Sequence, residues 1–238
     1  MTTAAVDQSK RTKPAARPYR SYEEYLALPS DGRLVEWVDG EIIEHMPATT
    51  THQNIVIFLV SLMRAFVERL ALGRVLAAPL EVKLWPEGPS REPDVLFVAQ
   101  NGPARIDDKR VMGAPDLIIE VVSPGSVTLD RITKFGEYER ADVREYWIVD
   151  PRPHQQQADF YVRDQAGRFV PAPVDDDGVY RCAVIPGFRV RPDWFHLTGP
   201  DDPLPDTQLP LAGMLADAPG LPDDLRDAYR QLARLLGR

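Results

Sequence analysis

The sequence has few of the residues that build thiolate or imidazole metal centres. It holds one cysteine among 238 residues, which excludes an intrachain disulfide and any zinc site made of several thiolates. The four histidines are scattered and lack the short spacings of a metal site. Neither a disulfide scaffold nor a multi-cysteine zinc site is therefore expected. The residues concerned are Cys182, His45, His52, His154 and His196.

Long hydrophobic runs and the glycine-rich signatures of nucleotide-binding enzymes are also missing. The longest apolar run, IVIFLVSLM at 55–63, is followed by charged residues and is too short to span a bilayer. The N-terminal stretch has no apolar segment, so no signal peptide is predicted and a cytoplasmic location is expected. No GxSxG, GxxxxGK[ST] or GxGxxG motif occurs. Acyl transfer, NTP hydrolysis and dinucleotide binding therefore lack support.

An excess of positive charge is absent as well. The chain has 28 Lys and Arg against 36 Asp and Glu, a net charge of −8, which argues against wholesale electrostatic capture of nucleic acid. Residues 1–18 are the exception, with four basic groups and one acid. Any nucleic-acid surface is therefore expected to be a local patch, a basic tail or a metal-neutralised groove.

By composition the chain divides into three parts. Residues 1–18, rich in Ala, Pro, Lys and Arg, are predicted to form a disordered basic arm. Residues 19–197 carry the periodicity of one globular domain, and 198–238 form a Pro/Asp-rich linker and an amphipathic helix. One stripe of that helix is apolar and is a candidate homodimer contact. It comprises Leu221, Leu225, Ala228, Leu232 and Leu235.

The order of elements within 19–197 predicts the fold class. A short helix begins at Ser21, and a hairpin turns at Asp39-Gly40, the pair that a type I′ turn requires. A long helix follows, capped by a threonine and ended by Gly73, and its apolar first half indicates a central position. Three strands, an amphipathic helix, a fourth strand and an edge hairpin come next. This order predicts an α/β (α+β) domain with a mixed β-sheet flanked by helices. The three strands span 73–86, 92–99 and 116–124, the amphipathic helix 128–142, the fourth strand 144–150 and the edge hairpin 157–174.

Two acidic residues interrupt otherwise apolar strands. Asp94 opens the strand EPDVLFVA and Glu120 lies inside DLIIEVVSP, and a buried charge is costly unless it is compensated. If these strands pair, opposed side chains lie ~5 Å apart and the two carboxylates can meet. Mg²⁺ would relieve their repulsion, activate water and stabilise a phosphoryl transition state. Alternatively, each acid sits at a strand end, solvated or bonded to backbone amides.

Taken together, several stretches resemble the PD-(D/E)XK nuclease superfamily, and more closely its Uma-type family of bacterial restriction endonucleases. They are DGRLVEWVDGEII, HQNIV, EPDVLFV, GAPDLIIEVVSPGS, KFGEYERADVREYWIVDP and IPGFRV, within residues 20–197. The resemblance implies a restriction-endonuclease-like core with an N-terminal hairpin, which cuts DNA with Mg²⁺ or Mn²⁺. It assigns Asp94 and Glu120 as the catalytic acids. Together with the carbonyl of Val121 they would hold the metal.

One position departs from the superfamily pattern. A lysine normally follows the second acid by two residues, where this chain has Val122. Uma-type sequences similarly carry the lysine on the next helix, and Lys134 matches it. The resemblance therefore implies that Lys134 positions or activates the attacking water. The alternative is an ordinary solvated helix lysine.

Further site candidates are weaker. His52 and Gln53 fall in the first turn of the long helix, whose positive end would point at an active site; a capping or surface role is the alternative. Glu41 on the hairpin is a candidate for a further metal acid, although for Glu41 and Glu36 a strand-surface ion pair is the simpler reading. Ser123 either contacts phosphate or caps the next helix.

The sequence thus predicts a metal-dependent endonuclease acting on duplex DNA, with no membrane association. Two alternatives stay open. One is a catalytically degenerate nuclease fold that binds nucleic acid or protein, which the missing motif lysine and the acidic core favour. The other is a phosphodiesterase of small nucleotides, which fits the same metal site.

Overall fold

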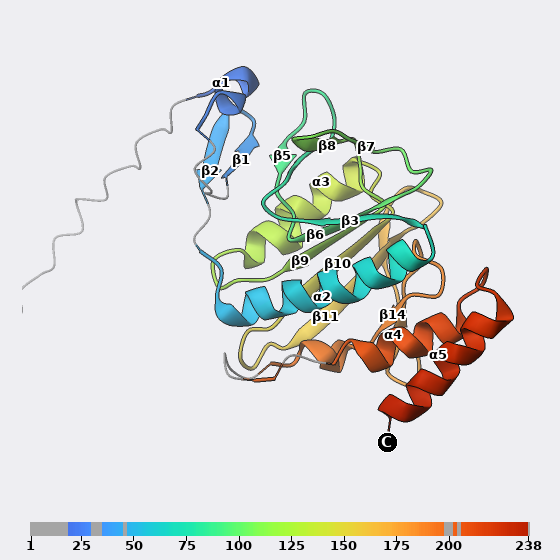
Figure 1. Ribbon diagram of the computed structural model, residues 1–238. Coiled ribbons are helices and arrows are strands. Elements are labelled where there is room, and N and C mark those ends of the chain that lie inside the picture. The colour runs from blue at the N-terminus through green and yellow to red at the C-terminus, as the bar shows by residue number, and fades with distance from the viewer. Residues whose placement is uncertain (1–18, 30–34, 45–46, 198–201, 204–205, 238) are drawn as a thin grey trace, which may run out of the picture.

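A six-stranded mixed sheet forms the middle of the molecule (Figure 1). The computed structural model describes residues 19–29, 35–44, 47–197, 202–203 and 206–237, and the predicted basic arm lies outside them. In sheet order the strands are β12 (Phe169–Pro171), β11 (Gln157–Arg163), β10 (Glu145–Asp150), β9 (Leu117–Val121), β6 (Val95–Ala99) and β3 (Gly73–Ala77). Strands β9 and β10 are parallel, and the other neighbours are antiparallel. The predicted mixed sheet and its edge hairpin, β11–β12, are confirmed.

Helices cover both faces of this sheet, with α2 (Thr50–Arg69) on one and α3 (Phe135–Arg140) on the other (Figure 1). Strand side chains alternate between the faces. On β9, Leu117 and Ile119 join the apolar cluster that α2 covers, whereas Ile118 joins the cluster beneath α3. By the same alternation Glu120 points toward α3.

Helix α2 is the main core helix, as its apolar sequence predicts. Thr49 caps it by accepting a hydrogen bond from the N–H of His52. The helix ends at Arg69, and the expectation that Gly73 ends it is wrong: Ala71 adopts a φ of 52° and Gly73 already begins β3. By length and composition α2 could also cross a membrane, but packing in the core accounts for its apolar face. That face buries Ile55, Phe58, Leu59, Leu62, Met63, Phe66 and Val67.

A second six-stranded sheet carries the N-terminal hairpin. Its strands, in sheet order, are β2 (Glu41–Glu44), β1 (Val35–Val38), β5 (Ser90–Arg91), β4 (Glu81–Lys83), β8 (Arg110–Met112) and β7 (Arg105–Ile106). A small pair, β13 (Tyr180–Arg181) and β14 (Arg189–Val190), completes the strands of the described residues. The prediction of one strand over 73–86 is wrong, because the chain leaves the central sheet after β3 and enters the second sheet as β4. Pro79 lies between them and has no N–H for a ladder.

The N-terminal elements follow their local signals closely. Ser21 caps α1 (Tyr22–Leu26) and forms a reciprocal capping box with Glu24. The β1–β2 turn places both Asp39 (φ 48°) and Gly40 (φ 86°) in the left-handed region, which is the requirement of a type I′ turn. The hairpin predicted from this dipeptide is confirmed.

The helix predicted over 128–142 is not regular. Residues Leu129–Lys134 form a π-helical segment, which continues as α3. π-Helical turns are rare and occur often at functional sites. Here the wide turn carries the two buried charged residues of this segment, Asp130 and Lys134.

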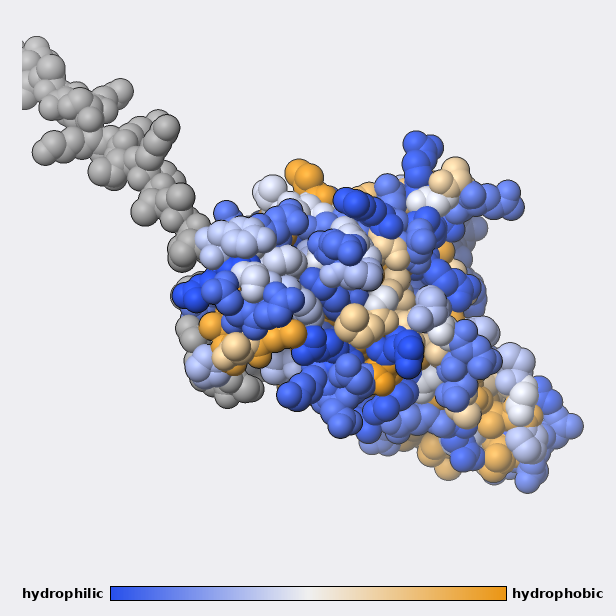
Figure 2. Space-filling view, turned by 90° about the horizontal axis from the view of Figure 1, so that it is seen from above, coloured by the Kyte–Doolittle hydropathy of each residue, from blue (hydrophilic) through white to orange (hydrophobic). Residues whose placement is uncertain are grey.

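Two helices close the chain, where the sequence predicts one. Helix α4 (Gln208–Asp217) packs against α2, and its Met214 and Leu215 belong to the main core cluster. Its uneven apolar pattern gives no clean helical stripe, so it was not predicted. Helix α5 (Asp223–Leu236) folds back on α4. Together they form a projection at the end of the molecule away from the N-terminal hairpin (Figures 1 and 2).

One buried carboxylate joins the β13–β14 segment to the central sheet. Glu145, on β10, is fully buried. Its Oε1 accepts hydrogen bonds from Trp147 (2.7 Å) and the Tyr180 hydroxyl (2.6 Å). Its Oε2 accepts hydrogen bonds from the backbone N–H groups of Ala183 (2.8 Å) and Val184 (3.0 Å). With donors on both oxygens, this site needs a carboxylate rather than an amide.

Glu145→Gln should therefore lower the free energy of unfolding by about 3 kcal/mol or more, because an amide NH₂ would face donors that then lack a partner. Urea denaturation followed by circular dichroism measures the loss. Glu68→Gln is the matched control, since Glu68 pairs with Arg64 on the exposed face of α2 and should change stability little. Equal losses in the two variants would contradict this role of Glu145.

Candidate active site

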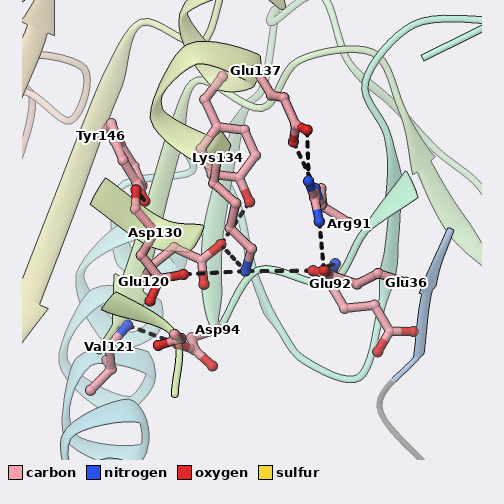
Figure 3. A network of polar contacts seen from close by, with 12 residues as sticks. Glu36, Arg91, Glu92, Asp94, Glu120, Val121, Asp130, Lys134, Glu137 and Tyr146 are labelled. Atoms are coloured by element: carbon pink, nitrogen blue, oxygen red, sulfur yellow. Dashed lines mark hydrogen bonds and ion pairs between the residues drawn. The ribbon is translucent and has the colours of Figure 1, made fainter. Parts of the chain in front are cut away.

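The register of β6 against β9 brings the two predicted acids together. Val95 lies opposite Ile119, so one step further along the antiparallel ladder places Asp94 opposite Glu120. Opposed residues share a face of the sheet, here the face that α3 covers. The pairing expected from the sequence is thus present, and both carboxylates lie at the same end of these strands (Figure 3).

Asp94 is held by two neighbours through a single oxygen. Its Oδ2 accepts a hydrogen bond from the N–H of Val121 at 2.7 Å and lies 3.2 Å from Nε2 of His52. Because an ionised carboxylate only accepts hydrogen bonds, Nε2 of the imidazole is the donor. The other oxygen, Oδ1, accepts no hydrogen bond from any described residue.

Glu120 shows the same division between its two oxygens. Its Oε1 accepts hydrogen bonds from the Tyr138 hydroxyl (2.6 Å) and the Lys134 ammonium (2.9 Å), whereas Oε2 receives none from the described part of the chain. Burial raises the pKa of Glu120 to about 8; Lys134 opposes the rise, and Asp130 and Asp94 add to it. Each acid thus presents one uncommitted oxygen.

Lys134 is a buried cation, not the solvated helix lysine of the alternative reading. Its side chain is 4% exposed, and Nζ lies 2.9 Å from Glu120, 3.5 Å from Glu36 and 3.6 Å from Asp130. Burial alone would lower the pKa of Lys134, but the three carboxylates outweigh it and raise the pKa above its usual value. The ammonium therefore stays charged across the physiological range.

Glu36 belongs to this site, although the sequence favoured a surface ion pair for it. It is fully buried on β1, where Trp37 pairs with Ser90 and thereby sets Glu36 opposite Arg91. Its carboxylate accepts hydrogen bonds from Arg91 Nη1 (2.8 Å) and the N–H of Glu92 (3.1 Å). No local pattern could reveal this contact, because it joins segments distant in the chain.

Arg91 and Asp130 are further members of the network drawn in Figure 3, where the Tyr146 hydroxyl donates to the carbonyl oxygen of Asp130. Arg91 is fully buried and donates two further hydrogen bonds to Glu137, at 2.7 and 2.6 Å. Burial raises the pKa of Asp130, and Lys134 opposes that rise. A signal for Asp130 was available, since it precedes Lys134 by four residues and so shares its helix face.

The remaining candidates lie away from the acids. Glu41 is exposed on β2 opposite Val38, and Gln53 is exposed on α2. Among the described residues neither forms a hydrogen bond or ion pair with the two acids or the lysine, whereas His52 does. The N–H of Ser123 donates to Ser126 Oγ at 2.9 Å, in keeping with a role in the turn before the helix. The structure therefore brings together Asp94, Val121, Glu120, Lys134 and His52.

The donor set fits a hard cation that keeps water ligands. Within the described ranges no group of three or more His, Cys, Asp or Glu side chains could hold a metal by itself. Mg²⁺, however, commonly uses one or two carboxylates and retains several waters. Oδ1 of Asp94 and Oε2 of Glu120 are oxygen ligands of that kind, and no thiolate lies among them.

Comparisons with known proteins agree with this fold. A family model described as "Uma2: Putative restriction endonuclease" matches residues 22–198. A crystal structure from Anabaena variabilis, described as "a putative nuclease belonging to DUF820", superimposes with a TM-score of 0.59 and 20% identity, over 73% of this chain and 96% of that one. At this identity the likeness establishes a shared fold. A search of curated proteins gave no match.

A bound divalent cation should stabilise the protein, and more so at alkaline pH. The folded pKa of Glu120 is raised to about 8, so its contribution to stability is present below the unfolded pKa and is lost as the pH rises through about 8. A cation pairs with the ionised acids and restores that loss. Thermal melts with and without Mg²⁺ or Mn²⁺ should show a larger rise in Tm at about pH 9 than at about pH 6.

Glu120→Gln should melt with a weaker dependence on pH and respond less to the metal. Glu68→Gln, on the exposed face of α2, should respond as the unmodified protein does. If Glu120→Gln and the unmodified chain gain the same Tm from the metal, Glu120 is not a ligand.

Proposed function

Since this chain belongs to the Uma2 family of restriction-endonuclease-like proteins, we propose that it hydrolyses phosphodiester bonds of duplex DNA with Mg²⁺, or Mn²⁺ in its place. The observation that carries the proposal is the meeting of Asp94, Glu120 and Lys134, with one uncommitted oxygen on each acid. The family and the nuclease-like fold support a nuclease. The DNA substrate and the metal are the parts of the proposal that experiment must test.

The chain's own contacts prepare each acid for the metal. The N–H of Val121 and the imidazole of His52 fix Oδ2 of Asp94 and leave Oδ1 for the cation. Tyr138 and Lys134 fix Oε1 of Glu120 and leave Oε2. The carbonyl of Val121 is proposed as a third ligand. When bound, the metal lowers the pKa of water and neutralises charge on the phosphate oxygens.

Lys134 acts in this proposal as a charged donor. A raised pKa makes the ammonium a poor base, so it orients the attacking water and stabilises developing negative charge instead. Glu36 and Asp130 also hold the ammonium, and Glu36 approaches it from the side opposite Glu120 and Asp130 (Figure 3). The side chain is therefore positioned before the substrate arrives.

The packing around Val122 favours a lysine on the helix over a lysine on the strand. Val122 occupies the position of the superfamily's usual lysine, and it is buried in the apolar cluster beneath α3. A lysine there would have to place its charge in that cluster. The π-helical segment instead brings Lys134 onto the same face, four residues before Tyr138, which also contacts Glu120.

The rival proposal is a non-catalytic nuclease fold that binds nucleic acid or protein. One observation favours it: Glu120 and Lys134 are 3% and 4% exposed, and Lys134 is already surrounded by carboxylates. Such enclosure also fits a small nucleotide better than a duplex. Two measurements distinguish these possibilities: the size of substrate that is cut, and whether DNA binding persists after one of the two acids is replaced.

Lys134→Met should abolish cleavage of duplex DNA, because it removes the charge that orients water while it keeps the stem volume. Loss of the cation also leaves three buried acids without their partner, at a cost of about 3–5 kcal/mol. Lys134→Arg therefore serves as a second variant: it keeps the charge, and so the fold, but moves the donors and should cut at least about 100-fold more slowly.

The matched control is Lys109→Met, an exposed lysine, which should cut at the unmodified rate. Single-turnover cleavage, with circular dichroism as a check of folding, measures all three variants. A folded Lys134→Met or Lys134→Arg protein that cuts at the full rate would remove this lysine from the mechanism.

Asp94→Asn distinguishes nuclease from binder. It should eliminate cleavage while electrophoretic mobility shifts still show binding of duplex DNA, because the change removes one charge from the metal site and leaves the surface intact. Linear duplex, single-stranded oligonucleotide and a dinucleotide should be offered in parallel. Cleavage of the dinucleotide alone would point to the small-nucleotide phosphodiesterase, and no cleavage of any substrate by the unmodified protein with metal would favour the binder.

A further inference from the structure

The C-terminal helix exposes an apolar surface that the rest of the described chain does not cover. No residue of α5 is buried. Leu232 and Leu236 are exposed, and Leu235 is 65% exposed. Leu209 of α4, also exposed, lies beside the end of α5 near Gly237. Figure 2 shows apolar residues gathered on this projecting end of the molecule.

The apolar residues of α5 follow a coiled-coil spacing. Within the helix, Leu225, Ala228, Leu232 and Leu235 are separated by three, four and three positions, the a/d pattern of a heptad. Leu221 continues the spacing but lies before the helix and packs against the main core cluster. A stripe limited to a and d positions is the narrow seam of paired helices, whereas a helix that packs on a globular core usually has a wider face. In α5 the face with Tyr229 and Ala233 is half-buried, and the seam continues beyond it into solvent.

The seam is complementary to itself when two copies run antiparallel. About a centre at residue 230, Leu225 of one helix lies opposite Leu235 of the other, and Ala228 lies opposite Leu232. Ala228, a small residue, then meets the larger Leu232, as interdigitating layers require, and the two leucines of the other pair meet each other. A twofold interface needs this kind of self-complementary surface.

The charges of α5 favour the same orientation. Its first half carries Asp223, Asp224 and Asp227 against one cation, Arg226, and its second half carries Arg230 and Arg234. Antiparallel pairing sets acidic halves beside basic halves and opposes the helix dipoles, whereas parallel pairing would set like charges side by side. We infer that α5 docks against α5 of a second copy of this chain, antiparallel, and so forms a homodimer. The surface lies outside residues 22–198, which the family model matches, and the inference does not depend on the nuclease activity.

Light scattering coupled to gel filtration tests the dimer with the full chain. The protein should elute with about twice its monomer mass of 26.8 kDa. Leu232→Glu with Leu235→Glu should give the monomer mass, because four charges would then lie in the seam of a dimer. Ile57→Glu is the matched control, an exposed apolar residue on α2, and should stay dimeric. A monomeric unmodified protein, or a dimer that survives the double substitution, overturns the inference.

Cysteine cross-linking tests the orientation. Ala228→Cys and Leu232→Cys are made as separate single variants and oxidised alone and as a mixture. In the antiparallel arrangement only the mixture should form a linked dimer, since position 228 faces 232. Linked dimers in either variant alone would indicate parallel helices and contradict the proposed pairing. The native Cys182 is buried, and burial raises the pKa of its thiol well above the usual value, so it should not react.

Discussion

A single buried ammonium, that of Lys134, determines how the parts of this site fit together. A charge taken out of water requires partners of opposite sign and good geometry, and here the partners come from three separate segments: Glu120 on β9, Glu36 on β1 and Asp130 on the π-helical segment. Because one cation joins three elements, the helix, the central sheet and the N-terminal hairpin must be in register at the same time.

Part of the chain's excess of acidic residues lies in this network. Four acids lie here beside only two cations, Lys134 and Arg91, and Arg91 also pairs with Glu137. The four acids are Asp94, Glu120, Asp130 and Glu36. The candidate site therefore has more acidic than basic groups, a balance that suits the divalent cation proposed above. A protein that is acidic overall can still approach a phosphate backbone if its site is neutralised in this way.

The sequence predicted those parts that obey a local period or a local turn. Asp94 and Glu120 could be placed together because strand side chains alternate and antiparallel neighbours face each other, and the hairpin followed from Asp39-Gly40. Lys134 came from a family resemblance, which the chain's family membership confirms, while its role stays a prediction. Glu36 was missed because its partners are set by pairing between distant strands. The break at Pro79 and the helix α4 were missed because apolar composition alone does not tell a strand that changes sheets, or a short buried helix, from its surroundings.

The ion pairs around Arg91 also bear on how the molecule folds. Glu36 and Arg91 are 55 positions apart, and Arg91 and Glu137 are 46 apart. Closing loops of this length costs chain entropy before the contacts repay it, and contacts of long sequence separation slow folding. During synthesis, Glu36 on the hairpin can pair with Arg91 only after β5 has been made, and Arg91 can pair with Glu137 only after α3 has been made. Arg91 therefore gains both of its carboxylate partners only after two long loops have closed, so the buried ion pairs of the candidate site cannot form from any short segment by itself.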